Sequence, residues 1–163
     1  MTDIAPPPPK PKAGSKNARL SMARLAAVQC IYQWLHTDSK KIDDVIGYYR
    51  DHYEGLHVDG DVMLTPEPKL FLGVVKGVEK RLGDLENIIA QFIKKDSESI
   101  ENKRDLLILS ILYCGAYELM SHHDIDAPII ISDYMHITRS FYEGAQPKLV
   151  NAVLDNLKKE LRV

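Results

Sequence analysis

The sequence predicts an all-α fold, built as a compact bundle of about seven helices. Apolar residues recur every three or four positions in one segment after another, which is the period of an amphipathic helix. Capping residues, prolines and glycines separate these segments, and no segment shows the alternation typical of a strand. The chain has 163 residues, 45% of them hydrophobic and 27% charged. These values suit one globular domain.

The N-terminal segment differs in composition from the rest of the chain. Residues 1–15 contain five prolines among Ala, Gly, Ser and Lys, a mixture that cannot bury enough apolar surface to offset the entropy of ordering. We therefore expect a flexible, disordered arm over residues 1–16 and a single helical domain over residues 17–163. The first helix of that domain is expected from Ala18 to His36, with one apolar stripe formed by Leu20, Ala23, Ala27, Ile31 and Leu35.

The next elements are bounded by capping residues, proline and glycine. Ser39 can cap a second helix that ends at Gly55, and residues 56–64 are expected to form a loop. The pair Thr65-Pro66 predicts the start of a third helix, because proline at the first helical position lacks a donor that the helix could not use. Within it, Gly73 and Gly77 would let another helix approach closely. Four further helices are expected after Gly83, at residues 84–95, 104–120, from Pro128 and from near Pro147.

The predicted helix over residues 104–120 differs from the others. Nearly every position in it is apolar, and a helix that is apolar all round is one surrounded by other helices. We therefore expect it at the centre of the bundle. No apolar run reaches the roughly 20 residues that span a bilayer, and no signal peptide is indicated, so we expect a cytoplasmic protein.

Charge is distributed unevenly along the chain. The 21 basic and 23 acidic residues give a net charge of −2. Up to Arg24, however, five basic residues face one acid, for a net +4, while the remainder carries −6. A basic arm on a mildly acidic body can hold a polyanion at one end and a basic protein elsewhere. A solvated tail that only aids solubility is the alternative reading of the arm.

The usual signatures of enzymes and metal sites are absent from the sequence. It has no phosphate-binding glycine loop, no nucleophile elbow and no pair of cysteines at metal spacing. Cys30 and Cys114 lie in apolar helical patterns and are expected to be buried, reduced thiols. The run from His122 to Asp126 is interpreted as a polar connection, and Asp59-Gly60-Asp61 as a turn. We expect neither catalysis nor a cofactor nor a metal.

Several motifs together resemble one family. Near the start stands Ala23-Arg24-Leu25-Ala26-Ala27-Val28-Gln29-Cys30-Ile31-Tyr32-Gln33-Trp34. Ala116-Tyr117-Glu118-Leu119 follows mid-chain, with Pro128 nine residues later. Ile131-Ser132-Asp133, Thr138-Arg139-Ser140-Phe141 and Lys148-Leu149-Val150-Asn151-Ala152-Val153-Leu154-Asp155 complete the series. Their order and spacing over about 140 residues resemble the NusB family of bacterial transcription antitermination factors.

The resemblance implies both a fold and a role. The fold would be all-helical, with two packed subdomains. The role would be non-enzymatic: binding of the boxA element of nascent single-stranded RNA together with the ribosomal protein NusE. With NusA, NusG and RNA polymerase, such proteins support transcription of ribosomal RNA operons. The charge split agrees with an RNA at the basic arm and a basic ribosomal partner on the body.

The resemblance also suggests which residues contact the RNA. Lys16, Arg19 and Arg24 on the first helix, and Lys148 with Asn151 on the last, are the expected RNA-binding residues. Arg24 should emerge at the positive end of the first helix, where backbone donors also favour anions. Asn151 could instead be a cap or a bridge between helices. Three residues within the motifs are expected to be partner-binding or structural, with RNA contact an alternative for the first two: Gln29, Tyr32 and Glu118.

At several positions the sequence differs from the family pattern, and these differences concern individual RNA contacts rather than the fold. Leu20, Ser21 and Met22 stand where relatives carry an arginine-rich run, and Asp133 replaces a Glu. The other departures are Ser132, Ala152, Gln146-Pro147 and Tyr113, the last at a position where Arg is common. Two other functions stay open: a helical adaptor that binds only protein, and the RNA-binding part of an rRNA cytosine methyltransferase.

Overall fold

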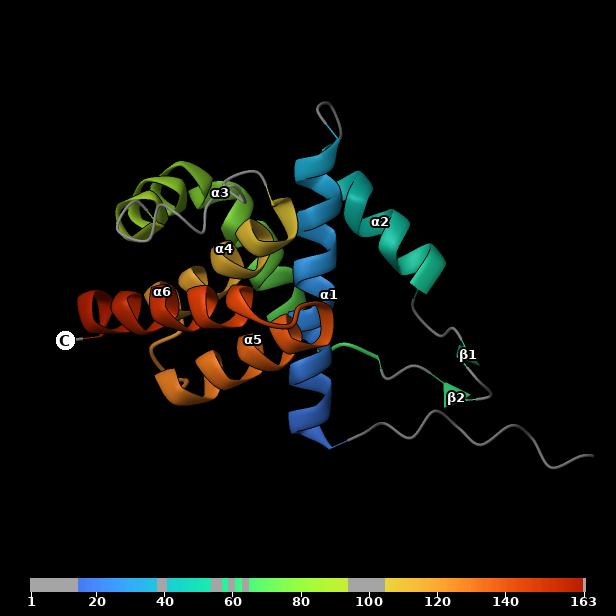
Figure 1. Ribbon diagram of the computed structural model, residues 1–163. Helices are drawn as coiled ribbons and strands as arrows, with labels where there is room; N and C mark the ends of the chain where they lie inside the picture. Colours follow the sequence, from blue (N-terminus) through green and yellow to red (C-terminus); the bar gives the residue numbers. More distant parts are fainter. Residues whose placement is uncertain are drawn as a thin grey trace, which may run out of the picture.

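The computed structural model describes residues 15–37, 41–53, 57–58, 61–62, 65–93 and 105–162. Within these ranges the chain forms six helices and one pair of two-residue strands (Figure 1). The elements are α1 (Lys16–His36), α2 (Ile42–Tyr53), β1 (His57–Val58), β2 (Asp61–Val62), α3 (Pro68–Ile93), α4 (Leu106–Ser121), α5 (Ala127–Phe141) and α6 (Ala145–Leu161). The predicted all-α class is confirmed.

The central position of α4 is also confirmed. It packs on α1 and α3 as well as on α5 and α6, so the two halves of the chain share one hydrophobic core. Ten of its residues are buried, from Ile108 to Leu119. The helix begins where predicted because Asp105 caps it, with Oδ1 accepting from the backbone N–H of Leu107 at 3.0 Å and of Ile108 at 3.2 Å.

Helix α3 replaces two predicted helices, which is why six helices are observed in the described residues rather than about seven. The backbone departs from helical angles only at Arg81, with φ −108° and ψ 16°, which kinks the helix without ending it. Gly83 does not adopt the positive φ of a helix stop, and the Asp84 carboxylate accepts from Arg81 Nε at 3.1 Å. The buried face continues past the kink through Leu85 and Ile89, because this second half also has apolar surface to cover.

Several element boundaries differ from the predictions by a few residues. Helix α3 begins at Pro68 and not at Pro66, because the Glu67 side chain accepts from Leu70 N–H at 2.7 Å. Helix α6 begins at Ala145, two residues before Pro147. Within the predicted loop 56–64, β1 and β2 pair antiparallel. The proposed cap Ser39 lies outside the described residues.

The N-terminal end of α1 overlaps the predicted arm. Ser15 caps the helix, since its hydroxyl accepts from Ala18 N–H at 3.1 Å, and Lys16 is already helical. Residues 1–14, which make up the rest of the predicted arm, lie outside the described residues. Figure 1 shows α1 (blue) standing between α2 on one side and α5 and α6 on the other. This arrangement leaves the middle of α1 at the bottom of a groove, described below.

The described helices contain no stretch long and apolar enough to cross a membrane. Both cysteines are buried and free of disulfides. Burial is the main reason that the pKa of Cys114 lies well above its ordinary value, and nearby Glu118 raises it further. This thiol is therefore protonated and unreactive in the folded protein.

Candidate nucleic-acid interface

Arg24 lies inside the protein, so the expectation that it emerges at the positive end of the first helix is wrong. Its side chain is only 2% exposed. Nε and Nη2 donate to the two carboxylate oxygens of Glu118 at 2.9 and 3.0 Å, and Nη1 donates to Asp133 at 2.7 Å. Arg24 is in the third turn of α1, facing α4 and α5, and not at the exposed end of the helix. Its guanidinium is therefore occupied by buried carboxylates.

Glu118 is the centre of this buried cluster. It also accepts from Tyr134 Oη at 2.5 Å and contacts His122 Nδ1 at 3.3 Å. Burial alone would raise the pKa of Glu118, but the hydrogen bonds from His122 and Arg24 and the charge of Arg24 hold it below its ordinary value. Glu118 is thus a buried, ionised carboxylate, and the cluster ties α1, α4 and α5 together.

The replacement of Glu by Asp133 is explained by the same cluster. The shorter Asp133 side chain accepts from Arg24 and, on the same oxygen, from Ser21 Oγ at 2.9 Å. Ser21 is another position at which the sequence departs from the pattern that the resemblance implies. These two departures are therefore linked, because Ser21 supplies a second donor for Asp133 and helps to hold it in place.

Two other departures have no equally direct account. Tyr113 is buried, and burial is the main reason that its pKa rises to about 12; its hydroxyl therefore stays neutral. Nothing in the structure explains Ala152.

A pocket on the surface gathers the predicted residues of the last helix. Lys148 and Asn151 line a hollow of about 470 Å³ together with Arg139, which the sequence analysis did not single out. We call this hollow the basic pocket; its remaining lining residues are Met135, Tyr142, Glu143, Gly144 and Pro147. Arg139, Lys148 and Asn151 are all exposed, so their polar ends are accessible to a ligand.

The start of α6 forms part of the basic pocket. Gly144 precedes α6 with φ 86°, a conformation that favours glycine, and no side chain caps the first backbone N–H groups of the helix. The positive end of the helix dipole therefore adds to the positive charges of Lys148 and Arg139. Glu143 is the one acidic residue that lines the basic pocket. An anion is the ligand that this arrangement favours.

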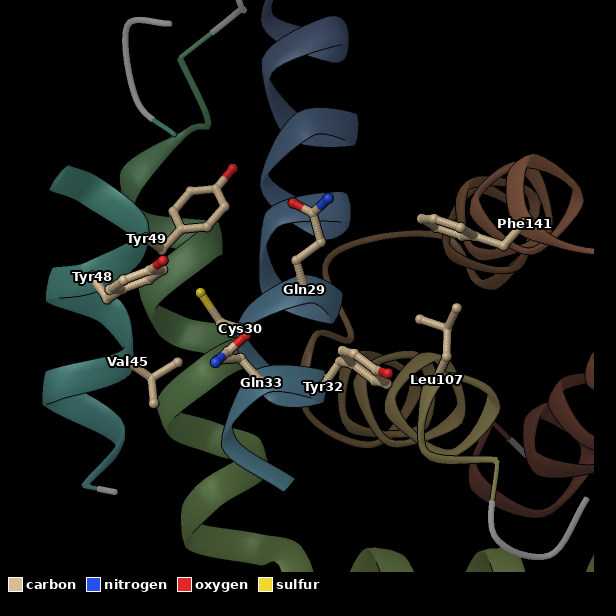
Figure 2. A pocket seen from close by; sticks show the side chains of 9 residues that line it. All are labelled: Gln29, Cys30, Tyr32, Gln33, Val45, Tyr48, Tyr49, Leu107 and Phe141. Atoms are coloured by element: carbon tan, nitrogen blue, oxygen red, sulfur yellow. The ribbon is translucent and has the colours of Figure 1, made fainter. Parts of the chain in front are cut away.

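A second hollow, of about 340 Å³, lies over the middle of α1 (Figure 2). We call it the aromatic groove; its lining residues are Gln29, Cys30, Tyr32, Gln33, Val45, Tyr48, Tyr49, Leu107 and Phe141. Three of its aromatic rings are partly open to solvent: Tyr32 is 38% exposed, Tyr48 45% and Phe141 46%. Figure 2 shows that α2 forms one wall and that α4 and α5 form the other. Gln29 and Tyr32, whose role the sequence left open, therefore line a surface groove.

The basic pocket and the aromatic groove meet at the end of α5. Phe141 is the last residue of α5 and lines the groove, while the next residue, Tyr142, lines the basic pocket. Tyr142 Oη donates to Asp105 Oδ2 at 2.6 Å. Its pKa is raised, first by burial, then by this bond, and also by the nearby Tyr32. Both hollows therefore reach the end of α5, with cations lining one and aromatic rings lining the other.

The remaining predicted residues lie elsewhere. Lys16 is exposed at the first position of α1, and Arg19 is partly buried, with Nε donating to the Thr65 carbonyl at 3.3 Å. Neither lines the basic pocket or the aromatic groove. Arg139 was not predicted to bind RNA, although it belongs to one of the family motifs. A single basic residue on an exposed helix face does not indicate a binding site in the sequence.

No group of three or more His, Cys, Asp or Glu side chains in the described ranges is placed to hold a metal ion. The segment from His122 to Asp126 leads from α4 into α5. Of its side chains, His122 turns inward to Glu118.

Comparison with known proteins agrees with the motifs. The model of the NusB family matches residues 21–159. The chain belongs to the NusB family. A NusB-family relative from Agrobacterium fabrum, named transcription antitermination protein NusB, is 33% identical over 155 residues, which cover 95% of this chain and 92% of the relative. A relative of the same name from Bartonella henselae is 33% identical over 141 residues, covering 86% of this chain and 87% of its own length.

The fold agrees with a solved NusB structure. The structure of NusB from T. maritima superposes with a TM-score of 0.69 and 18% identity, covering 90% of this chain and 92% of that one. The NusB fold expected from the motifs is thereby confirmed. Membership in a family whose relatives are named as antitermination proteins is consistent with a role outside catalysis.

Proposed function

We propose that this NusB-family chain is an antitermination factor that binds boxA-type single-stranded RNA together with the ribosomal protein NusE. The observation that supports this proposal most strongly is that the basic pocket and the aromatic groove both reach the end of α5, through the consecutive residues Tyr142 and Phe141. Proteins that hold single-stranded nucleic acid combine cations along the backbone with aromatic rings on which bases stack. Both parts lie here on either side of the end of α5.

Each hollow has a separate task in the proposal. Arg139 and Lys148 contact phosphates, and the Asn151 amide hydrogen-bonds to phosphate, sugar or a base edge. Tyr32 and Phe141 stack on bases in the aromatic groove. Arg24, being buried, positions α1 against α4 and α5 instead. Lys16 and Arg19 add positive charge at the start of α1, near the arm.

The protein partners follow from charge and family. The chain from Leu25 onward carries a net −6, which favours a basic protein such as NusE. In the cytoplasm, the resulting RNA-protein complex would join NusA, NusG and RNA polymerase at ribosomal RNA operons. No step in this role makes or breaks a covalent bond.

Salt dependence tests the basic side. Labelled boxA-like RNA is titrated at several salt concentrations, with and without NusE. Each phosphate contact to a single strand contributes about 0.7 to the slope of log affinity against log salt. We expect Arg139→Ala with Lys148→Ala to reduce the slope by about 1.4, and NusE to strengthen binding. Lys159→Ala, an exposed lysine on α6 outside the pocket, is the control and should leave the slope unchanged.

The aromatic side is tested separately. Stacking of a base on an aromatic ring is worth about 1–3 kcal/mol, so Tyr32→Ala or Phe141→Ala should weaken binding by roughly 5- to 150-fold without changing the salt slope. Ile129→Ala is the control, because Ile129 is 54% exposed on α5 and lines neither hollow. Equal affinity for RNA in all variants would contradict the proposed surface. A wild-type protein without RNA affinity would favour a protein-only adaptor.

A further inference from the structure

The last turn of α5 carries one residue of each hollow. Arg139 lines the basic pocket, and Phe141, which is 46% exposed, lines the aromatic groove. Only residues 142–144 then connect α5 to α6. In the proposed function these two side chains contact the same strand, so the affinity for RNA depends on how firmly this turn of the helix is held.

The side chain of Tyr142 attaches this turn to α4. Its Oη donates to Asp105 Oδ2 at 2.6 Å, and its backbone N–H donates to the Thr138 carbonyl at 2.9 Å, which closes the end of α5. Among the described residues, the bond to Asp105 is the only side-chain hydrogen bond that joins residues 138–144 to another helix. Glu143 and Gly144 are exposed, so Tyr142 is the residue that anchors the connection.

Asp105 is a firm anchor because both of its carboxylate oxygens are used. Oδ1 caps α4 by accepting from the backbone N–H groups of Leu107 and Ile108, while Oδ2 accepts from Tyr142. A hydrogen bond to an ionised acceptor is stronger than one between neutral groups. Burial, and then the bond to Asp105, raise the pKa of Tyr142, so its hydroxyl stays protonated and remains a donor at neutral pH.

We propose that Tyr142 is a positioning residue for single-stranded RNA, because its bond to Asp105 holds Arg139 and Phe141 where both can contact one strand. This inference rests on the proposed function. The Tyr142 hydroxyl donates inward to Asp105, so it orients the two contacting side chains and does not donate to the RNA. Helix ends fray where few contacts hold them, and a site that is only partly in its binding-competent state binds more weakly in the same proportion.

Tyr142→Phe removes the hydrogen bond and keeps the ring. In the folded variant, we expect the NMR order parameters of the Arg139 and Phe141 amides to fall, while that of Ile129, near the start of α5, stays unchanged. If the binding-competent fraction falls to between about a tenth and a third, the affinity for boxA-like RNA falls about 3- to 10-fold. The salt slope should not change, because Arg139 and Lys148 keep their charges.

Two further variants distinguish positioning from a general loss of stability. Tyr117→Phe is the matched control, because Tyr117 lies on α4 and lines neither hollow; it should change neither the order parameters nor the RNA affinity. Asp105→Asn is the conservative rescue, since its amide oxygen can still cap α4 and its NH₂ can donate to the Tyr142 oxygen. RNA affinity should not fall in Asp105→Asn alone, whereas adding Tyr142→Phe to it should weaken binding as Tyr142→Phe does by itself.

Several results would overturn the proposal. Unchanged order parameters in Tyr142→Phe would show that the bond does not hold the turn. Lower order parameters with unchanged RNA affinity would remove the role of Tyr142 and leave the proposed RNA binding intact. An equal loss of RNA affinity in Tyr117→Phe would show a general effect that is not specific to Tyr142. A wild-type chain without RNA affinity would instead overturn the proposed function, and the role of Tyr142 in RNA binding with it.

Discussion

Replacing Arg24 by Ala separates a structural role from an RNA-binding one. The substitution leaves Glu118, which has no exposed surface, without its bidentate partner. Breaking a buried ion pair by removing one member costs about 3–5 kcal/mol. Glu118 keeps its bonds from Tyr134 and His122, and Asp133 is 18% exposed and can be hydrated. The expected loss is therefore about 3 kcal/mol, at the lower end of that range.

Urea unfolding followed by circular dichroism at pH 7 measures this loss. A typical domain is stable by only about 5–15 kcal/mol, so a fall of 3 kcal/mol moves the midpoint clearly. Arg24→Lys keeps the charge but loses the two-pronged geometry and should cost less than Arg24→Ala. RNA affinity, measured on the folded protein, should change by less than about twofold, since 0.4 kcal/mol corresponds to that factor.

Arg139→Ala is the matched control because its effects should be reversed. Arg139 is exposed, so the free energy of unfolding of the Arg139→Ala variant should change by no more than about 0.5 kcal/mol, while its RNA affinity falls. A loss of less than about 1 kcal/mol for Arg24→Ala, together with loss of RNA binding from a fully folded protein, would refute the structural role of Arg24. Arg24 would then have to leave its carboxylates to meet the RNA.

Three further predictions concern stability. Gly77→Ala should destabilise by about 1–3 kcal/mol in thermal unfolding, because its Cβ would lie 2.0 Å from Tyr117 Cζ. Gly73→Ala should be neutral or stabilising, because its Cβ would have no atom within 4 Å apart from its chain neighbours and the backbone of its own helix. Arg162→Ala should cost about 2 kcal/mol in urea, since Arg162 donates to the carbonyls of Leu119, Ile125 and His122 at 2.8–2.9 Å; no loss beyond that of Lys159→Ala would refute this role. The folded state holds the pKa of Glu118 below its ordinary value of 4.5, so this carboxylate stabilises the protein above pH 4.5 and the contribution disappears as pH falls through the lower, folded pKa. In an acid titration of stability, Glu118→Gln should therefore flatten the decline below pH 4.5, and an unchanged curve would show that Glu118 does not contribute.

Local sequence patterns were sufficient for the helices and for the buried face of each. The 3.6-residue period shows which residues of α1 and α6 avoid water, because burial of apolar area dominates folding and leaves this period in the chain. They were less reliable at α3, where Gly83 and Asp84 resemble a stop and a cap. The apolar contacts of Leu85 and Ile89 outweigh those local preferences and keep the helix continuous.

The all-α class, the central helix and each family motif could be predicted from sequence patterns, since each of them is carried by residues close together in the chain. The role of Arg24 depends instead on the fold, because its partners Glu118 and Asp133 are 94 and 109 residues away. A basic residue in a helical pattern is expected to be exposed, because the local sequence does not show that an acidic residue of another helix will pair with it inside the protein. The same holds for the basic pocket and the aromatic groove, which exist only where the end of α5 meets α1, α2 and α6.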